Sequence, residues 1–113
     1  MGDCIFCSIV NGDIPSKKVY ENEYVFAFRD INPEAPVHIV IIPKKHIATI
    51  MDVDTSSNVS NELIKAAQHI AEKEGIEKSG FRLVNNCNEE GGQTVYHLHV
   101  HLLGGRNMKW PPG

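Results

Sequence analysis

Three of the six histidines in the chain stand at every second position of one short stretch, His97, His99 and His101, with aliphatic residues between them. Alternation with a period of two is typical of a half-buried β-strand, so residues 96–103 are predicted to form a strand that carries the three imidazoles on one face. Residues four apart on a strand are separated by about 13 Å. His97 and His101 therefore cannot bind the same metal ion.

Two kinds of chemistry fit such a row of imidazoles. One is a metal ion held by His99 and His101, and the other is a metal-free row in which one imidazole attacks and its neighbours assist. Three purely structural histidines are a weaker interpretation, because protonation would place like charges side by side.

A Cys-x-x-Cys motif near the start of the chain, Cys4 and Cys7, supplies half of a tetrahedral zinc site. A redox-active pair and two buried cysteines are alternatives, but the redox reading would require a preceding strand, and turn residues follow instead. His46 is a candidate further ligand because histidine is the commonest partner of cysteine at zinc. The chain has three cysteines, an odd number that excludes a complete disulfide framework and favours a reducing compartment.

The length of 113 residues predicts a single domain over residues 1–113. A formal charge of −3 argues against a nucleic-acid-binding or anionic-membrane surface. No segment reaches the roughly 18 apolar residues of a membrane span, and the start lacks the pattern of a signal peptide. The expected location is the cytoplasm.

Periodic segments elsewhere predict an α+β domain built on a mostly antiparallel sheet. A helix is expected from about Val59 to Ala71, ending at Gly75. His38 lies in an apolar strand, where it is either a core histidine or a fourth imidazole of the site, and its context alone favours the core. The predicted strands other than 96–103 are a hairpin of 19–21 and 24–30, a central strand at 37–43, and a strand at 81–85.

Several motifs together resemble one known family. The stretch His97–Leu103 is similar to the His-φ-His-φ-His-φ-φ signature of the histidine triad proteins, where φ is an apolar residue. The similarity extends to the Hint branch, the histidine triad nucleotide-binding proteins, and covers nearly the whole chain. The further stretches that carry it are 28–33, 36–38, 42–46, 91–96 and the terminal Trp-Pro-Pro-Gly of 110–113.

The resemblance implies a five-stranded, mostly antiparallel sheet with two helices, continued across a homodimer. It also implies an enzyme, a phosphoramidase that hydrolyses the P–N bond of purine nucleoside 5′-monophosphoramidates, such as adenosine phosphoramidate, through a nucleotidylated histidine. His99 would be the nucleophile, with His101 and His38 beside the α-phosphate. Thr94, where the branch more often has serine, would help the leaving group.

The resemblance also assigns binding residues for an AMP-type or GMP-type nucleotide and for a metal. One structural Zn²⁺ per chain would be held by Cys4, Cys7, His46 and His97. The nucleotide would contact Asp30 and Ile31 at the ribose and base, Asn86, Gly92 and Gln93 in the loop before the triad, and Trp110 of the tail near the partner's site.

Three alternatives stay open. The first is a nucleotide-binding or scaffolding module with vestigial catalysis, and the second is a dinucleoside polyphosphate hydrolase. The third is a metal-dependent phosphohydrolase using His99 and His101 as ligands, which is disfavoured because we expect no carboxylate near these imidazoles.

Overall fold

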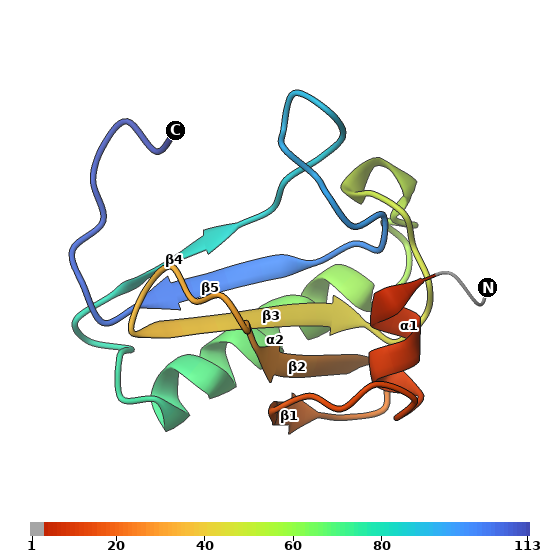
Figure 1. Cartoon of the computed structure of the whole chain (residues 1–113), viewed down its shortest axis with the longest axis horizontal. Helices are drawn as coiled ribbons and strands as arrows, with labels where there is room; N and C mark the ends of the chain where they lie inside the picture. Colours follow the sequence, from red (N-terminus) through yellow and green to blue (C-terminus); the bar gives the residue numbers. More distant parts are fainter. Residues whose placement is uncertain (1–3) are drawn as a thin grey trace.

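The structure is a computed structural model that describes residues 4–113, and within these residues five strands form one antiparallel sheet in the order β1-β2-β3-β5-β4. Helices α1 and α2 lie on opposite faces of the sheet, as Figure 1 shows. The predicted α+β fold is confirmed. The elements are α1 (Ile5–Val10), β1 (Lys18–Glu21), β2 (Val25–Arg29), β3 (Val37–Pro43), the 3₁₀ helix η1 (Ile50–Asp52), α2 (Val59–Lys73), β4 (Phe81–Val84) and β5 (Val100–Gly104).

The central strand β3 pairs with β2 on one side and β5 on the other, as its apolar sequence predicts. Its side chains alternate between the two faces, so Ile39 packs towards α2 while Val40 packs towards α1. In the register between strands, Val40 lies opposite His101 and His38 opposite Leu103. His38 and His101 consequently share the α1 face of the sheet.

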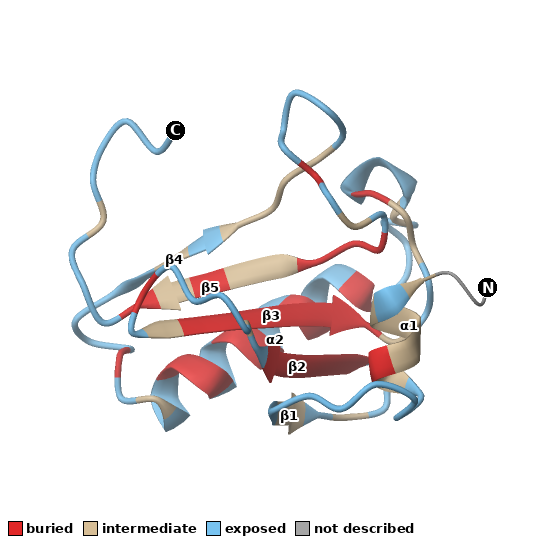
Figure 2. Ribbon diagram, viewed as in Figure 1, coloured by how far each residue is buried: buried red, intermediate tan, exposed pale blue. Residues whose placement is uncertain are grey.

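Helix α2 has the predicted apolar stripe, and all of its members are buried. Figure 2 shows the buried side of α2 turned towards the sheet. Gly75 has a φ of +74°, the left-handed conformation that glycine adopts most easily after a helix. The predicted end of the helix is confirmed.

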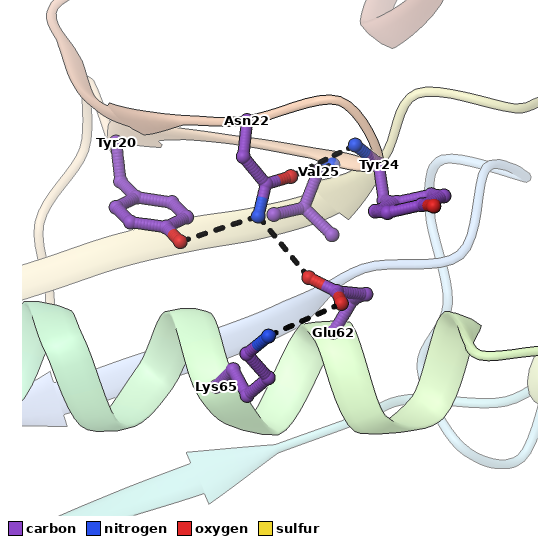
Figure 3. Close-up of polar contacts among 6 residues, drawn as sticks. All are labelled: Tyr20, Asn22, Tyr24, Val25, Glu62 and Lys65. Carbon is purple, nitrogen blue, oxygen red and sulfur yellow. Dashed lines mark hydrogen bonds and ion pairs between the residues drawn. The ribbon is translucent and has the colours of Figure 1, made fainter.

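The turn of the β1–β2 hairpin is attached to α2 by a polar cluster, drawn in Figure 3. Asn22 accepts hydrogen bonds from the N–H groups of Tyr24 and Val25 at 2.8 and 2.9 Å and donates one to Glu62 at 3.1 Å. Lys65 also contacts the Glu62 carboxylate, at 3.4 Å. A buried carboxylate is costly unless it is paired, so these partners explain how Glu62 is accommodated on the inner face of α2.

The strand predicted over 96–103 is shorter than expected. It begins only at Val100, so His97 and His99 precede it. The ladder with β4 ends where Val84 pairs with His101, and the backbone before that point bonds elsewhere: the Leu98 N–H donates to the Ile47 carbonyl at 2.6 Å. The prediction of one open face of imidazoles is therefore wrong for this part of the chain, where His97 and His99 are 0% and 5% exposed.

After β5 the chain continues without regular structure, as predicted. Arg82 on β4 donates a hydrogen bond to the Lys109 carbonyl at 2.9 Å, while the Trp110 side chain is 81% exposed. Among the residues that the structure describes, no helix has the length and apolar character needed to cross a membrane.

Candidate active site

Helix α1 and the triad stretch bring four metal-binding side chains together. Donor atoms of Cys4, Cys7, His46 and His97 all lie within 4.8 Å of one another. Cys4 caps α1, its Sγ accepting the Cys7 N–H at 3.3 Å, and the same Sγ lies 3.3 Å from His97 Nδ1. The Cys7 Sγ lies 3.4 Å from His46 Nδ1.

The protonation of His97 suits it to ligation. Its Nε2–H donates to the Pro43 carbonyl at 2.8 Å, which leaves the lone pair of Nδ1 directed at the two thiols. Burial lowers the pKa of His97. Burial also raises the pKa of the Cys7 thiol, and the neighbouring Cys4 thiol raises it further. A cation at this position would stabilise both thiolates, so the four residues together fit a tetrahedral metal ion.

His99, the middle histidine, is held in one tautomer by the backbone. Its Nδ1–H donates to the His97 carbonyl at 2.7 Å, so the lone pair is on Nε2. The rings of Phe6 on α1 and His99 stand perpendicular to each other with their centroids 5.1 Å apart, and Asn85 donates to the His99 carbonyl at 2.9 Å. Because no buried side-chain nitrogen of the described residues lacks a hydrogen-bond partner, the unpartnered Nε2 must reach the surface.

His38 and His101 form a hydrogen bond whose donor and acceptor are fixed by the neighbouring backbone. The Glu34 N–H donates to His38 Nδ1 at 3.0 Å, so neutral His38 carries its proton on Nε2. That proton is donated to His101 Nδ1 at 2.9 Å, which places the proton of neutral His101 on its own Nε2. Burial, followed by the charges of His99 and His38, lowers the pKa of His101 to about 4, so this imidazole is neutral at pH 7.

The site thus combines two imidazoles of opposite character. His99 presents a lone pair and His101 presents an N–H, and their rings stand edge to face with centroids 5.0 Å apart. A lone pair beside a hydrogen-bond donor suits nucleophilic displacement at a centre that bears a negatively charged oxygen, because the lone pair attacks the centre while the N–H stabilises the oxygen.

One expectation about carboxylates is wrong. Asp30 lies beside the imidazoles, with its Oδ2 3.4 Å from His38 Nε2, and it forms with His38 and His101 a second cluster of possible metal ligands. The Glu34 N–H, however, keeps the His38 proton on Nε2, the nitrogen that faces this cluster. That proton is donated to His101 Nδ1, so neither of these two nitrogens presents a lone pair to a metal ion in this arrangement.

A groove of about 650 Å³ opens next to Asp30 and His38. It is lined by residues of the β2–β3 loop, including Asp30 and Ile31, and by His38, which is hydrogen-bonded to His101. The Ile31 side chain is 91% exposed. The volume lies within the range of sites for small molecules.

The loop before the triad is shaped by its own contacts. Gly92 has a φ of +79°, and a Cβ at Gly91 would lie 2.4 Å from the Cys87 carbonyl oxygen. The buried Gln93 accepts the Asn88 N–H at 2.9 Å and donates to two backbone carbonyls, those of Ala48 and Val95, at 2.9 and 3.0 Å. The Gln93 side chain is therefore fully engaged inside the protein.

Two other predicted site residues are not hydrogen-bonded to the triad histidines. Thr94 is exposed and Asn86 is half-buried, and within residues 4–113 neither side chain has a hydrogen bond to the triad. Sequence reasoning missed the backbone groups of Glu34 and Pro43, which carry no signal in residue type. It also missed Phe6, whose apolar character within the Cys-x-x-Cys motif was the available clue.

Comparisons with known proteins agree with this geometry. The model of the HIT domain family matches residues 11–108. The chain is 50% identical over 107 residues to the purine nucleoside phosphoramidase of Escherichia coli K12, which covers 94% of this chain and 90% of that protein. It is 45% identical over 114 residues to the 14 kDa zinc-binding protein of Brassica juncea, covering 98% and 100% of the two chains.

A solved structure gives the same result. The HIT family hydrolase from Legionella pneumophila Philadelphia 1 superposes with a TM-score of 0.95 at 54% identity, covering 98% of this chain and 100% of that one. The fold, the paired imidazoles and these relatives lead to one conclusion: the chain belongs to the HIT domain family and is a hydrolase of the HIT type.

Proposed function

We propose that the protein hydrolyses the P–N bond of purine nucleoside 5′-monophosphoramidates through a covalent intermediate on His99. The observation that carries the proposal is the orientation of His99, whose Nδ1–H is bonded to the His97 carbonyl so that the Nε2 lone pair is free to attack. The Escherichia coli relative named as a purine nucleoside phosphoramidase supports this choice of substrate.

The reaction takes two displacements at phosphorus. In the first, His99 Nε2 bonds to phosphorus, the P–N bond breaks, and the leaving amine takes a proton from the solvent while His101 Nε2–H donates a hydrogen bond to a phosphate oxygen. In the second, water attacks phosphorus and releases a proton to the solvent, the bond from His99 to phosphorus breaks, and the nucleoside monophosphate leaves. His38 supports both steps by donating its Nε2–H to His101 Nδ1. Thr94 is proposed as a polar group beside the leaving amine.

The nucleoside is proposed to occupy the groove beside His38. The Asp30 carboxylate suits the ribose hydroxyls, and the exposed side chain of Ile31 offers an apolar surface to the purine. Asn86 and the backbone of Gly92 and Gln93 complete the proposed contacts at the phosphate.

We also propose that Cys4, Cys7, His46 and His97 hold one Zn²⁺ per chain, in agreement with the zinc-binding relative. Two thiolates and two imidazoles leave no open coordination position, so the ion would have a structural role. In that role these side chains secure α1 against the triad stretch. The His97 carbonyl then has a fixed position from which it orients His99.

A homodimer in the cytoplasm completes the proposal. The edge strand β4 presents Phe81 and Leu83, which are 37% and 43% exposed, and an uncovered apolar edge favours pairing with a second copy. Figure 2 shows the exposed character of this edge. Trp110, at 81% exposure, would then lie near the nucleotide site of the partner.

The test is a panel of nucleoside phosphoramidates and dinucleoside polyphosphates, ranked by kcat/KM for the wild type and for His99→Ala. We expect adenosine phosphoramidate to be preferred, and His99→Ala to lose at least about 10³-fold in kcat while still binding AMP. A preference for dinucleoside polyphosphates would replace the proposed substrate. Nucleotide binding without turnover would indicate a binding module instead.

A further inference from the structure

The segment that follows β5 holds the loop between β2 and β3. The guanidinium of Arg106 donates two hydrogen bonds to the Glu34 carbonyl, from Nε at 3.2 Å and from Nη2 at 3.0 Å. Beside it, Gly105 has a φ of +87°, and a Cβ there would lie 2.8 Å from Pro36 Cβ. Segment 105–106 is therefore in direct contact with the loop that lines the groove.

Glu34 links this contact to the imidazoles. Its N–H donates to His38 Nδ1 at 3.0 Å, and His38 Nε2 donates to His101 Nδ1 at 2.9 Å. The hydrogen bonds therefore run in one direction, from the Glu34 amide through His38 to His101. The last donor in the series is His101 Nε2–H.

The direction of this series decides whether His101 Nε2 carries an N–H that can donate a hydrogen bond to the substrate. If the Glu34 amide moves away, only the Asp30 carboxylate, 3.4 Å from His38 Nε2, still favours a proton on that nitrogen, and part of the neutral His38 population can carry its proton on Nδ1 and accept a hydrogen bond at Nε2. His101 would then donate from Nδ1, and its Nε2 would present a lone pair in place of a proton. A phosphate oxygen next to that lone pair would be repelled and would lose the hydrogen bond from His101.

We propose that Arg106 is a positioning residue for the reaction: by holding the Glu34 carbonyl, it fixes the Glu34 backbone so that the Glu34 N–H stays on His38 Nδ1 and the protons of His38 and His101 stay on Nε2. Pro33 and Glu34 are exposed, so water has access to this part of the loop. The effect on turnover rests on the proposed function, whereas the effect on the tautomers does not.

The experiment reads the tautomers directly, from long-range ¹H–¹⁵N correlation spectra of uniformly labelled full-length protein at pH 7.5. The variants are Arg106→Met, which removes the donors, and Arg106→Lys, which keeps a charged donor. Arg82→Met is the matched control, because Arg82 also binds a tail carbonyl, that of Lys109, but has no contact with Glu34.

We expect the wild type and Arg82→Met to carry the protons of His38 and His101 on Nε2. Arg106→Met should show mixed tautomers at both histidines and a fall in kcat of about tenfold, with KM changed less than about twofold. Arg106→Lys should restore most of both properties. If Arg106→Met does not fold, Arg106→Lys is compared with the wild type in the same spectra. We then expect a smaller but measurable loss of the Nε2 tautomer at both histidines.

Three results would overturn the proposal: a wild-type His38 protonated on Nδ1, an Arg106→Met protein with unaltered tautomers, or altered tautomers with an unaltered kcat. If the wild type does not hydrolyse phosphoramidates at all, the proposed function fails. The tautomer spectra still test the positioning role of Arg106 in that case.

Discussion

Gln93 offers a sharp test of how the loop before the triad works. The family resemblance places Gln93 at the nucleotide, but in the structure its side chain makes three hydrogen bonds to backbone groups of the protein. One of these holds the N–H of Asn88, whose φ is +61°. We therefore expect Gln93 to act mainly on stability, by fixing the loop.

The perturbation is Gln93→Met, which keeps the length of the side chain and removes its polar atoms. Each lost hydrogen bond costs about 0.5–1.5 kcal/mol, and the three bonds together predict a loss of about 2–4 kcal/mol in the free energy of unfolding. For a chain of 113 residues this corresponds to a fall in Tm of roughly 8–16 °C.

The assay is thermal unfolding followed by circular dichroism, together with KM and kcat measured well below the transition. Asn86→Ala is the control, because the Asn86 side chain makes no hydrogen bond that fixes the loop within residues 4–113 and is proposed to contact the phosphate; it should leave Tm nearly unchanged and lower kcat/KM. A Gln93→Met protein with wild-type Tm and a raised KM would refute the reasoning, since Gln93 would then serve the nucleotide.

Three further outcomes follow from the site. Because burial lowers the pKa of folded His101 to about 4 while an unfolded histidine titrates near 6.5, the unfolded state binds more protons between these values. Stability should therefore be lost as the pH falls from about 6.5 to 4, and urea titrations across that range should show a smaller loss for His101→Asn. Metal analysis of protein purified without chelator should find one zinc per chain; the double variant Cys4→Ser, Cys7→Ser should lose zinc and at least about 2 kcal/mol of stability. Light scattering at micromolar concentration should give a dimeric mass, which Leu83→Lys on the exposed edge should reduce; a monomeric wild type would contradict the proposed pairing.

The sequence was sufficient for elements whose side chains have a clear period. The apolar run of β3 and the apolar stripe of α2 predict which residues are buried, and the structure confirms both. Periodicity does not predict where the pairing of a strand with its neighbour ends. For this reason the strand at the triad was predicted too long, since β4 ends at Val84 and leaves the backbone of His99 to bond elsewhere.

The chemistry of the imidazoles depended on groups that residue types do not reveal. The tautomers of His97 and His38 are set by the Pro43 carbonyl and the Glu34 amide, backbone atoms present at almost every position of any sequence. The approach of Asp30 to the imidazoles depends on the antiparallel pairing of β2 with β3, which the Asp30 N–H extends by donating to the His38 carbonyl at 3.0 Å. These contacts follow from the three-dimensional register of the strands.

The most direct test of the central claim is to identify the covalent intermediate. Wild-type protein mixed with adenosine phosphoramidate is quenched rapidly, digested, and mapped by mass spectrometry. We predict one nucleoside monophosphate on the peptide that spans His97 to His101, with fragment ions placing it on His99. An adduct located on His38 or His101, or a His99→Ala protein that retains wild-type turnover, would contradict the account.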